Sequence, residues 1–153
     1  GPRNMVDLKD LVQHYWYHPA MGGSISIKQV LPAAIASSPE LKDWLSQPMK
    51  SAGISSLNDE EHIWLPSPDS LDPYKSLPYL FENYSEAELE ELLESDEEAR
   101  IADGAAAMTA YGKLQFTEVD GDEREKTRAG LLQYCELDTL AMVVILKKLY
   151  ELI

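Results

Sequence analysis

The stretch that decides how this chain folds is Gly130-Leu-Leu-Gln-Tyr-Cys-Glu-Leu-Asp-Thr-Leu-Ala-Met-Val-Val-Ile-Leu-Lys-Lys-Leu-Tyr150. Helical spacing places several of its side chains on one face, at intervals of 4, 3, 4, 3 and 4 residues: Leu131, Cys135, Asp138, Met142, Ile145 and Leu149. All of them except Asp138 are apolar. The spacing therefore predicts one long helix with a carboxylate in its buried stripe.

Asp138 has two interpretations on physical grounds. A carboxylate that faces a packed interior costs free energy unless another group pairs with it. The pair is structural if Asp138 caps a neighbouring helix or meets a buried arginine. Alternatively Asp138 is a metal ligand with a phenol beside it, since Tyr134 lies four residues earlier on the same helix. The pattern alone leaves both open.

Composition limits the class of protein. A chain of 153 residues is long enough for one domain with a real core. Its 13 basic and 27 acidic residues leave a net charge of −14, which argues against a broad basic surface for nucleic acid. A local contact through metal ions stays compatible with that charge. The single cysteine favours a reducing compartment, so we expect a cytoplasmic protein.

Membrane insertion is not expected, because no uninterrupted apolar run approaches the length of a membrane span. The longest such run, 140–146, is typical of a core segment. The chain opens with Gly-Pro and lacks an initiator methionine, which indicates a fragment or a processing scar. We therefore expect its ends to differ from natural domain boundaries.

Capping and breaker residues predict a mostly helical chain with few or short strands. The expected helices are 8–17, a short one that follows a Ser26–Gln29 capping box, 39–47, 105–114 and a final helix that reaches 152. Asp103 precedes one of them and is either its N-cap or an acidic site residue. No internal repeat is visible.

Two segments have a different character. Residues 49–78 contain many breakers and little periodicity, which predicts a long irregular insertion or a functional flap. Residues 82–98 carry nine acidic side chains and no Lys or Arg, and their pattern predicts an acidic helix with a solvated face.

Two other candidate chemistries are weaker. His14 and His18 have the i, i+4 spacing that suits zinc on a helix, but no third ligand is evident nearby. Cys135 lies in the predicted buried stripe, and burial makes a thiol unreactive. Packing against aromatic side chains or surface exposure is the simpler interpretation for the histidines, and burial is the simpler one for Cys135.

A resemblance adds to this picture. The segment Tyr134-Cys-Glu-Leu-Asp138-Thr139 resembles the last motif of RNase H-like 3′–5′ exonucleases with four metal-binding carboxylates (the DEDD type), in the variant that carries tyrosine. Together with Asp72-Pro73-Tyr74, Ile101-Ala102-Asp103-Gly104 and the segments around Tyr17 and Ile25, it resembles the C-terminal domain of the bacterial domain-of-unknown-function family 2779.

That resemblance implies an α/β RNase H-like fold of which this chain is the mostly helical C-terminal half. It further implies that Asp138 ligates Mg²⁺ or Mn²⁺, that Tyr134 orients the attacking water, and that nucleic acid is the substrate. Asp103 is a distant further metal candidate. The Asp-x-Glu and the second Asp that begin the family pattern are not identifiable here.

We therefore expect residues 1–153 to form a single, incomplete exonuclease-like domain. Two-metal phosphoryl chemistry needs the full set of carboxylates, so the chain by itself is expected to be inactive. It would need the missing N-terminal half of its domain as a partner. The alternative is a non-catalytic helical module that binds a protein. An incomplete domain should also expose apolar surface, which predicts self-association into a homo-oligomer.

Overall fold

The computed structural model describes residues 6–77, 102–116, 118 and 120–153, and this part of the chain is helical, with no strand. The prediction of a mostly α-helical chain is therefore confirmed for it. The chain divides into two compact units, one made of residues 1–76 and 136–153 and the other of residues 77–135. The predicted acidic helix of residues 82–98 lies outside the described residues.

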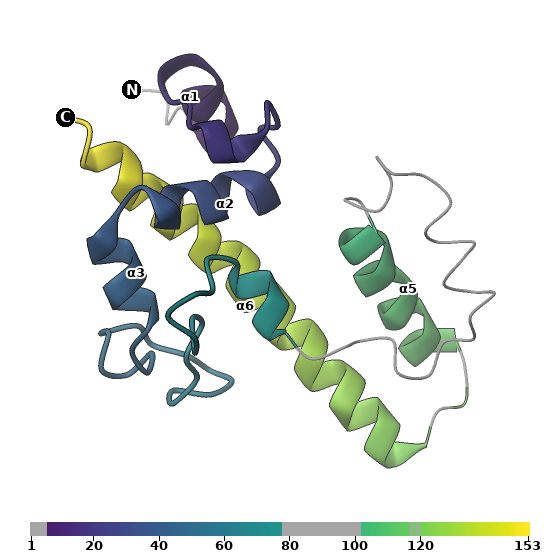
Figure 1. Ribbon diagram of the computed structural model, residues 1–153. Coiled ribbons are helices and arrows are strands. Elements are labelled where there is room, and N and C mark those ends of the chain that lie inside the picture. The colour runs from purple at the N-terminus through teal and green to yellow at the C-terminus, as the bar shows by residue number, and fades with distance from the viewer. Residues whose placement is uncertain (1–5, 78–101, 117, 119) are drawn as a thin grey trace, which may run out of the picture. The chain divides into compact units, whose positions relative to one another are not determined.

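The first unit begins with three short helical elements. Helix α1 spans Leu8–Tyr15, the 3₁₀ helix η1 spans Pro19–Met21, and α2 spans Ile27–Ala36 (Figure 1). Asp7 caps α1, because its carboxylate accepts a hydrogen bond of 2.9 Å from the Lys9 amide. Two glycines at positive φ, Gly22 and Gly23, then turn the chain towards α2.

Helix α2 departs from its sequence signals in two ways. Ser26 occupies the N-cap position, but its side chain makes no capping hydrogen bond, so the predicted capping box is wrong. Pro32 lacks a backbone donor and commonly kinks or ends a helix, yet α2 continues through it to Ala36. The apolar residues that follow explain this: Ala33, Ala34 and Ile35 are all buried, and their packing stabilises the last turn.

The rest of the first unit is helix α3 (Pro39–Leu45), an irregular segment made of residues 46–76, and the C-terminal part of helix α6 (Gly121–Tyr150). The irregular segment includes the 3₁₀ helix η2 (Pro73–Ser76). It is not loosely attached: Met49, Trp64 and Leu65 are fully buried, and the Leu65 amide donates to the Leu45 carbonyl at 3.0 Å. Its role as an insertion or a flap stays a prediction, but its apolar side chains belong to the core.

The core of the first unit collects around one face of α6. A cluster joins α1, η1, α2 and α6 through Val12, Met21, Val30, Ala33 and Ile145. Four residues that precede Ile145 on α6 are also buried: Leu137, Leu140, Ala141 and Val144. Lys148, after Ile145, is buried as well. These positions face the shorter helices, so α6 is the element against which the unit is assembled.

The predicted face of α6 is confirmed only in part: Ile145 is buried and Leu149 packs against the core cluster, but most of the buried positions lie on another side of the helix. In the stripe expected to be buried, Cys135 is exposed and Met142 is 48% exposed. The buried row 137, 141, 144 and 148 has the same spacing, displaced by about one residue, or about 100° around the helix axis. Each row is apolar apart from one charged residue, Asp138 in the predicted row and Lys148 in the buried one, so periodicity alone could not choose between them.

The second unit contains helix α5 (Ala102–Phe116) and the first half of α6. Ala110 and Leu114 are buried in α5. The guanidinium of Arg124 donates a 2.7 Å hydrogen bond to the Leu114 carbonyl, which satisfies a carbonyl near the C-terminus of α5. The unit is therefore stabilised both by burial and by this contact at a helix end.

Candidate functional site

Asp138, the main candidate from sequence, is paired with a phenol. The Tyr74 hydroxyl donates a hydrogen bond of 2.6 Å to Oδ1 of Asp138. Tyr74 lies in η2, where the Asp72 carboxylate accepts from the Tyr74 amide at 3.1 Å and fixes the local backbone. The Lys28 ammonium lies 5.2 Å from the centre of the Tyr74 ring. A hydrogen bond to a carboxylate offsets part of the cost of burying it.

This contact differs from both structural pairs considered for Asp138. The partner is neither an arginine nor a helix N-terminus, and it comes from residues 49–78, which the sequence predicted to be an irregular insertion or a functional flap. The motif places Tyr134 four residues before Asp138 on α6, and Tyr74 is a further phenol, which donates to Asp138. The assignment of catalytic roles to Tyr134 and Asp138 stays a prediction.

Asp103, the second metal candidate, lies inside α5. The helix begins at Ala102, so Asp103 belongs to its first turn and is not the N-cap residue. Residue 103 belongs to the second unit and Asp138 to the first. The described part of the chain contains no group of three His, Cys, Asp or Glu side chains that could hold a metal ion.

The donor set around Asp138 therefore does not fit a two-metal centre. One carboxylate, with an oxygen engaged by Tyr74, is too few oxygen ligands for Mg²⁺ or Mn²⁺ within the described residues. The further carboxylates required by the resemblance would have to come from elsewhere. The Mg²⁺ or Mn²⁺ cofactor stays a prediction.

The histidine pair is separated by the end of a helix. Helix α1 ends at Tyr15, so His14 and His18 do not share a helical face. His14 Nδ1 donates to the Asp10 carbonyl at 2.7 Å, while His18 Nδ1 accepts from the Ala20 amide at 3.2 Å and caps η1. These backbone contacts give both imidazoles structural roles. The expectation that Cys135 is buried is wrong, since its side chain is exposed.

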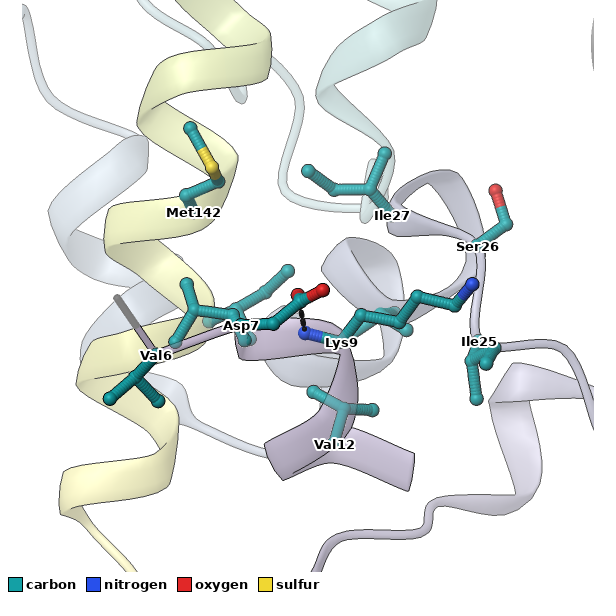
Figure 2. Close-up of a pocket in the computed structure, with 11 residues that line it drawn as sticks. Val6, Asp7, Lys9, Val12, Ile25, Ser26, Ile27 and Met142 are labelled. Carbon is teal, nitrogen blue, oxygen red and sulfur yellow. Dashed lines mark hydrogen bonds between the residues drawn. The ribbon is translucent and has the colours of Figure 1, made fainter. Parts of the chain in front are cut away.

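A groove that the sequence did not predict opens between α1, α2 and α6. Figure 2 shows its lining, which is mostly aliphatic and encloses about 860 Å³. Val12, Val30 and Ile145 are the buried lining residues, and Val6 and Met142 are substantially exposed in it. Its polar lining residues are Asp7, Lys9 and Ser26. The groove belongs entirely to the first unit.

A second feature missed from sequence is the buried charge of Lys148. Its ammonium donates to the Ser37 carbonyl at 3.1 Å and to Glu151 Oε2 at 2.8 Å. The Ser38 hydroxyl donates to Glu151 Oε1 at 2.6 Å and accepts from the Leu41 amide at the start of α3. Lys148 thus lies at the C-terminus of α2 and Glu151 at the N-terminus of α3, where the helix dipoles favour those charges.

Two opposing effects act on the pKa of the Glu151 carboxyl in this contact. Partial burial acts to raise the pKa of its carboxyl. The hydrogen bonds from Lys148 and Ser38, and the positive charges of Lys148 and Lys147, outweigh burial and hold the pKa of Glu151 below its ordinary value. The charged form of Glu151 is therefore the one that the fold stabilises.

The sequence contained a weak signal for Lys148. The apolar row 137, 141 and 144 continues to 148 at helical spacing. Lys148 ends this row and Glu151 follows three residues later, so the spacing is compatible with a buried ion pair. The macrodipole of α6 offers a simpler reason for a lysine in a last turn, so sequence alone favours the exposed interpretation.

Comparison with known proteins identifies no relative of this chain. No family model, no curated protein and no solved structure matches this chain. By length and composition α6 could cross a membrane, a test that the core helix of a soluble protein also passes, and 33% of its most apolar stretch is buried inside the fold. The resemblance to RNase H-like exonucleases therefore rests on the sequence motifs alone.

Proposed function

We propose that the first unit is a non-catalytic helical module that binds an apolar segment of another protein in the groove between α1, α2 and α6. The observation that carries the proposal is the groove itself, an open, mostly aliphatic surface of about 860 Å³ (Figure 2). Soluble proteins seldom leave a continuous apolar surface uncovered unless something binds there.

The chemistry of the lining favours a protein segment. Groove recognition of a helix relies on aliphatic anchors along one face, and here aliphatic side chains from α1, α2 and α6 line one surface. Val6 is 65% exposed and Met142 is 48% exposed, so apolar contact continues to the edges of the groove. A partner that covers such edges is broader than a small ligand enclosed in a pocket.

The net charge of the chain indicates which residues should flank the apolar segment of the partner. The chain carries −14, and the groove lining itself holds one acidic and one basic side chain, Asp7 and Lys9. Long-range attraction therefore favours an apolar segment flanked by lysine or arginine. The same net charge disfavours nucleic acid as the groove's partner.

Titration with defined peptides tests the proposal. The probes are a helical peptide with leucines on one face and lysines on the other, a matched peptide with glutamates in place of the lysines, and decanoate as a small apolar ligand. Binding to the full chain is followed by calorimetry and by NMR shifts of groove residues. The variant Met142→Glu places a charge in the groove, and Leu57→Glu places the same charge at a fully exposed site outside it.

We expect the lysine peptide to bind most tightly, with an affinity reduced about tenfold or more by Met142→Glu and unchanged by Leu57→Glu. Preferential binding of decanoate would overturn the protein partner in favour of a small ligand. Peptide binding that is equal in both variants would overturn the groove as the site.

The second candidate is the exonuclease-like function, which we propose on the sequence resemblance. Its support is the Tyr134-x-x-x-Asp138 motif, in which the carboxylate of Asp138 is only partly buried. In this proposal Asp138 ligates Mg²⁺ or Mn²⁺ in a complete RNase H-like domain, Tyr134 orients water, Asp103 remains a further candidate, and nucleic acid is the substrate. The described residues lack the other carboxylates.

Degradation of labelled single-stranded DNA or RNA by the full-length protein, with added Mn²⁺, tests this candidate. Asp138→Ala should abolish cleavage, whereas Tyr74→Phe removes the same hydrogen bond but keeps the carboxylate and should retain cleavage. No cleavage by the wild-type protein, or undiminished cleavage by Asp138→Ala, would contradict it.

A further inference from the structure

Helix α1 is the wall of the groove that packs least against the rest of the first unit. Of its eight residues only Val12 is buried, whereas five of the ten residues of α2 are buried. Leu8 and Leu11, the other apolar residues of its inner face, are half-buried. One fully buried side chain therefore supplies most of the apolar contact that holds α1 in place.

Polar contacts add nothing to this attachment. The Asp7 carboxylate accepts from the Lys9 amide at 2.9 Å, and His14 Nδ1 donates to the Asp10 carbonyl at 2.7 Å, so both contacts stay within α1 and its N-cap. In the described part of the chain, no side chain of α1 forms a hydrogen bond or an ion pair with α2 or α6. Apolar packing alone holds the helix.

The length of α1 makes its helical form dependent on that packing. A helix shorter than about 12 residues is only marginally stable by itself in water, and α1 has eight. If α1 leaves the core, it therefore loses helical structure as well. Such a local opening needs less free energy than unfolding of the whole unit, because few buried contacts are broken.

The chain has a fixed point directly after α1. Trp16 is partly buried against the core cluster, and its ring stacks on His18 with ring centres 6.3 Å apart. Met21, in η1, is buried in the same cluster. The backbone of Trp16 is extended, with φ −140° and ψ 130°, so the helix ends there. Helix α1 can therefore open while residues 16–21 stay packed.

We propose that α1 is a lid of the groove, which opens in the free chain and closes on a bound apolar segment. Leu8, Lys9 and Val12 form its wall of the groove, opposite Met142 and Ile145 of α6 (Figure 2). A segment that contacts both walls adds to the few contacts that hold α1, and so favours the closed state. The closing rests on the function proposed for the groove, but the opening does not.

Hydrogen–deuterium exchange of the full chain, followed by mass spectrometry, tests the opening. The amides of residues 12–15 and 33–36 form the last turns of α1 and α2. In the free chain we expect the amides of α1 to exchange about 100-fold faster than those of α2. Equal rates in the two helices would overturn the lid.

The same measurement with the leucine–lysine helical peptide tests the closing. At about ten times its dissociation constant, the peptide should slow exchange in α1 about tenfold and leave α3 unchanged. A peptide that binds without slowing α1 would overturn the closing. Absence of binding would overturn the groove function and the closing together, whereas the rates in the free chain decide the opening by themselves.

A matched pair of substitutions tests whether α1 opens separately. Val12 and Val30 are each 2% exposed and belong to the same cluster, one in α1 and the other in α2. Val12→Ala should speed exchange in α1 about tenfold and leave α2 unchanged, whereas Val30→Ala should speed exchange in α2. If Val12→Ala speeds exchange in α2 as much as in α1, the helix is an integral part of the fold and the proposal is wrong.

Discussion

Two carboxylates accept hydrogen bonds from different kinds of donor: Asp138, in the C-terminal half of α6, and Glu151, just beyond its end. Asp138 accepts a hydrogen bond from a neutral phenol, Tyr74, whereas Glu151 accepts from the ammonium of Lys148 and from Ser38. The first joins α6 to the irregular segment, and the second joins it to the junction of α2 and α3. Sequence analysis selected Asp138, but the stronger electrostatic contact belongs to Glu151, because its partner is a buried cation.

The largest expected effect comes from Lys148. Lys148→Ala removes a buried side chain, leaves the Ser37 carbonyl without this donor and deprives Glu151 of its cation, so we expect the free energy of unfolding to fall by about 3 kcal/mol. Chemical denaturation measures it. Lys147→Ala is the matched control at the neighbouring exposed position. Equal losses in both variants would contradict a special role for Lys148.

Glu151 should have a smaller effect, because its side chain is about one-third exposed and water partly replaces its contacts. Glu151→Gln keeps the shape but removes the charge, and we expect a loss of about 1 kcal/mol in denaturant unfolding. Glu60→Gln, at an exposed position, serves as the control and should cost little. A neutral outcome for Glu151→Gln would show that Lys148 is adequately satisfied by the Ser37 carbonyl.

Acid should reveal the contribution of Glu151. The pKa of Glu151 is lower in the folded chain than its ordinary value of 4.5, so the unfolded chain binds this proton more readily. The stability that Glu151 contributes is therefore present above that value and is lost as pH falls through the folded pKa. Unfolding measured across this range should show a smaller acid-induced loss in Glu151→Gln than in the wild type; identical profiles would argue against the contact.

A small effect, similar to that of Glu151→Gln, is expected at Tyr74. Tyr74→Phe removes only the hydroxyl that donates to Asp138, and we expect a loss of about 1 kcal/mol in the free energy of unfolding. Tyr17→Phe, at an exposed tyrosine, should be neutral. If Asp138→Asn destabilises the chain by a similar amount, and the double variant by no more than either single one, the hydrogen bond accounts for the structural role of Asp138.

Local signals predicted the helices well and their orientation poorly. The predicted starts at residues 8 and 39 agree with α1 and α3, whose N-caps are Asp7 and Ser38. These signals work because a cap acts within one helical turn. The rotation of α6 and the pairing of Asp138 with Tyr74 depend on residues far away in the chain, which no local pattern specifies.

The sequence by itself determined a mostly helical, acidic chain with one long apolar helix near its C-terminus, because helix periodicity, caps and charge are local properties. Only the tertiary structure decided which apolar face of α6 is buried, that Lys148 is buried with Glu151, and that α1, α2 and α6 leave an apolar groove. The physical reason is that α6 is apolar on more than one face, so the choice of buried face depends on which shorter helices pack against it.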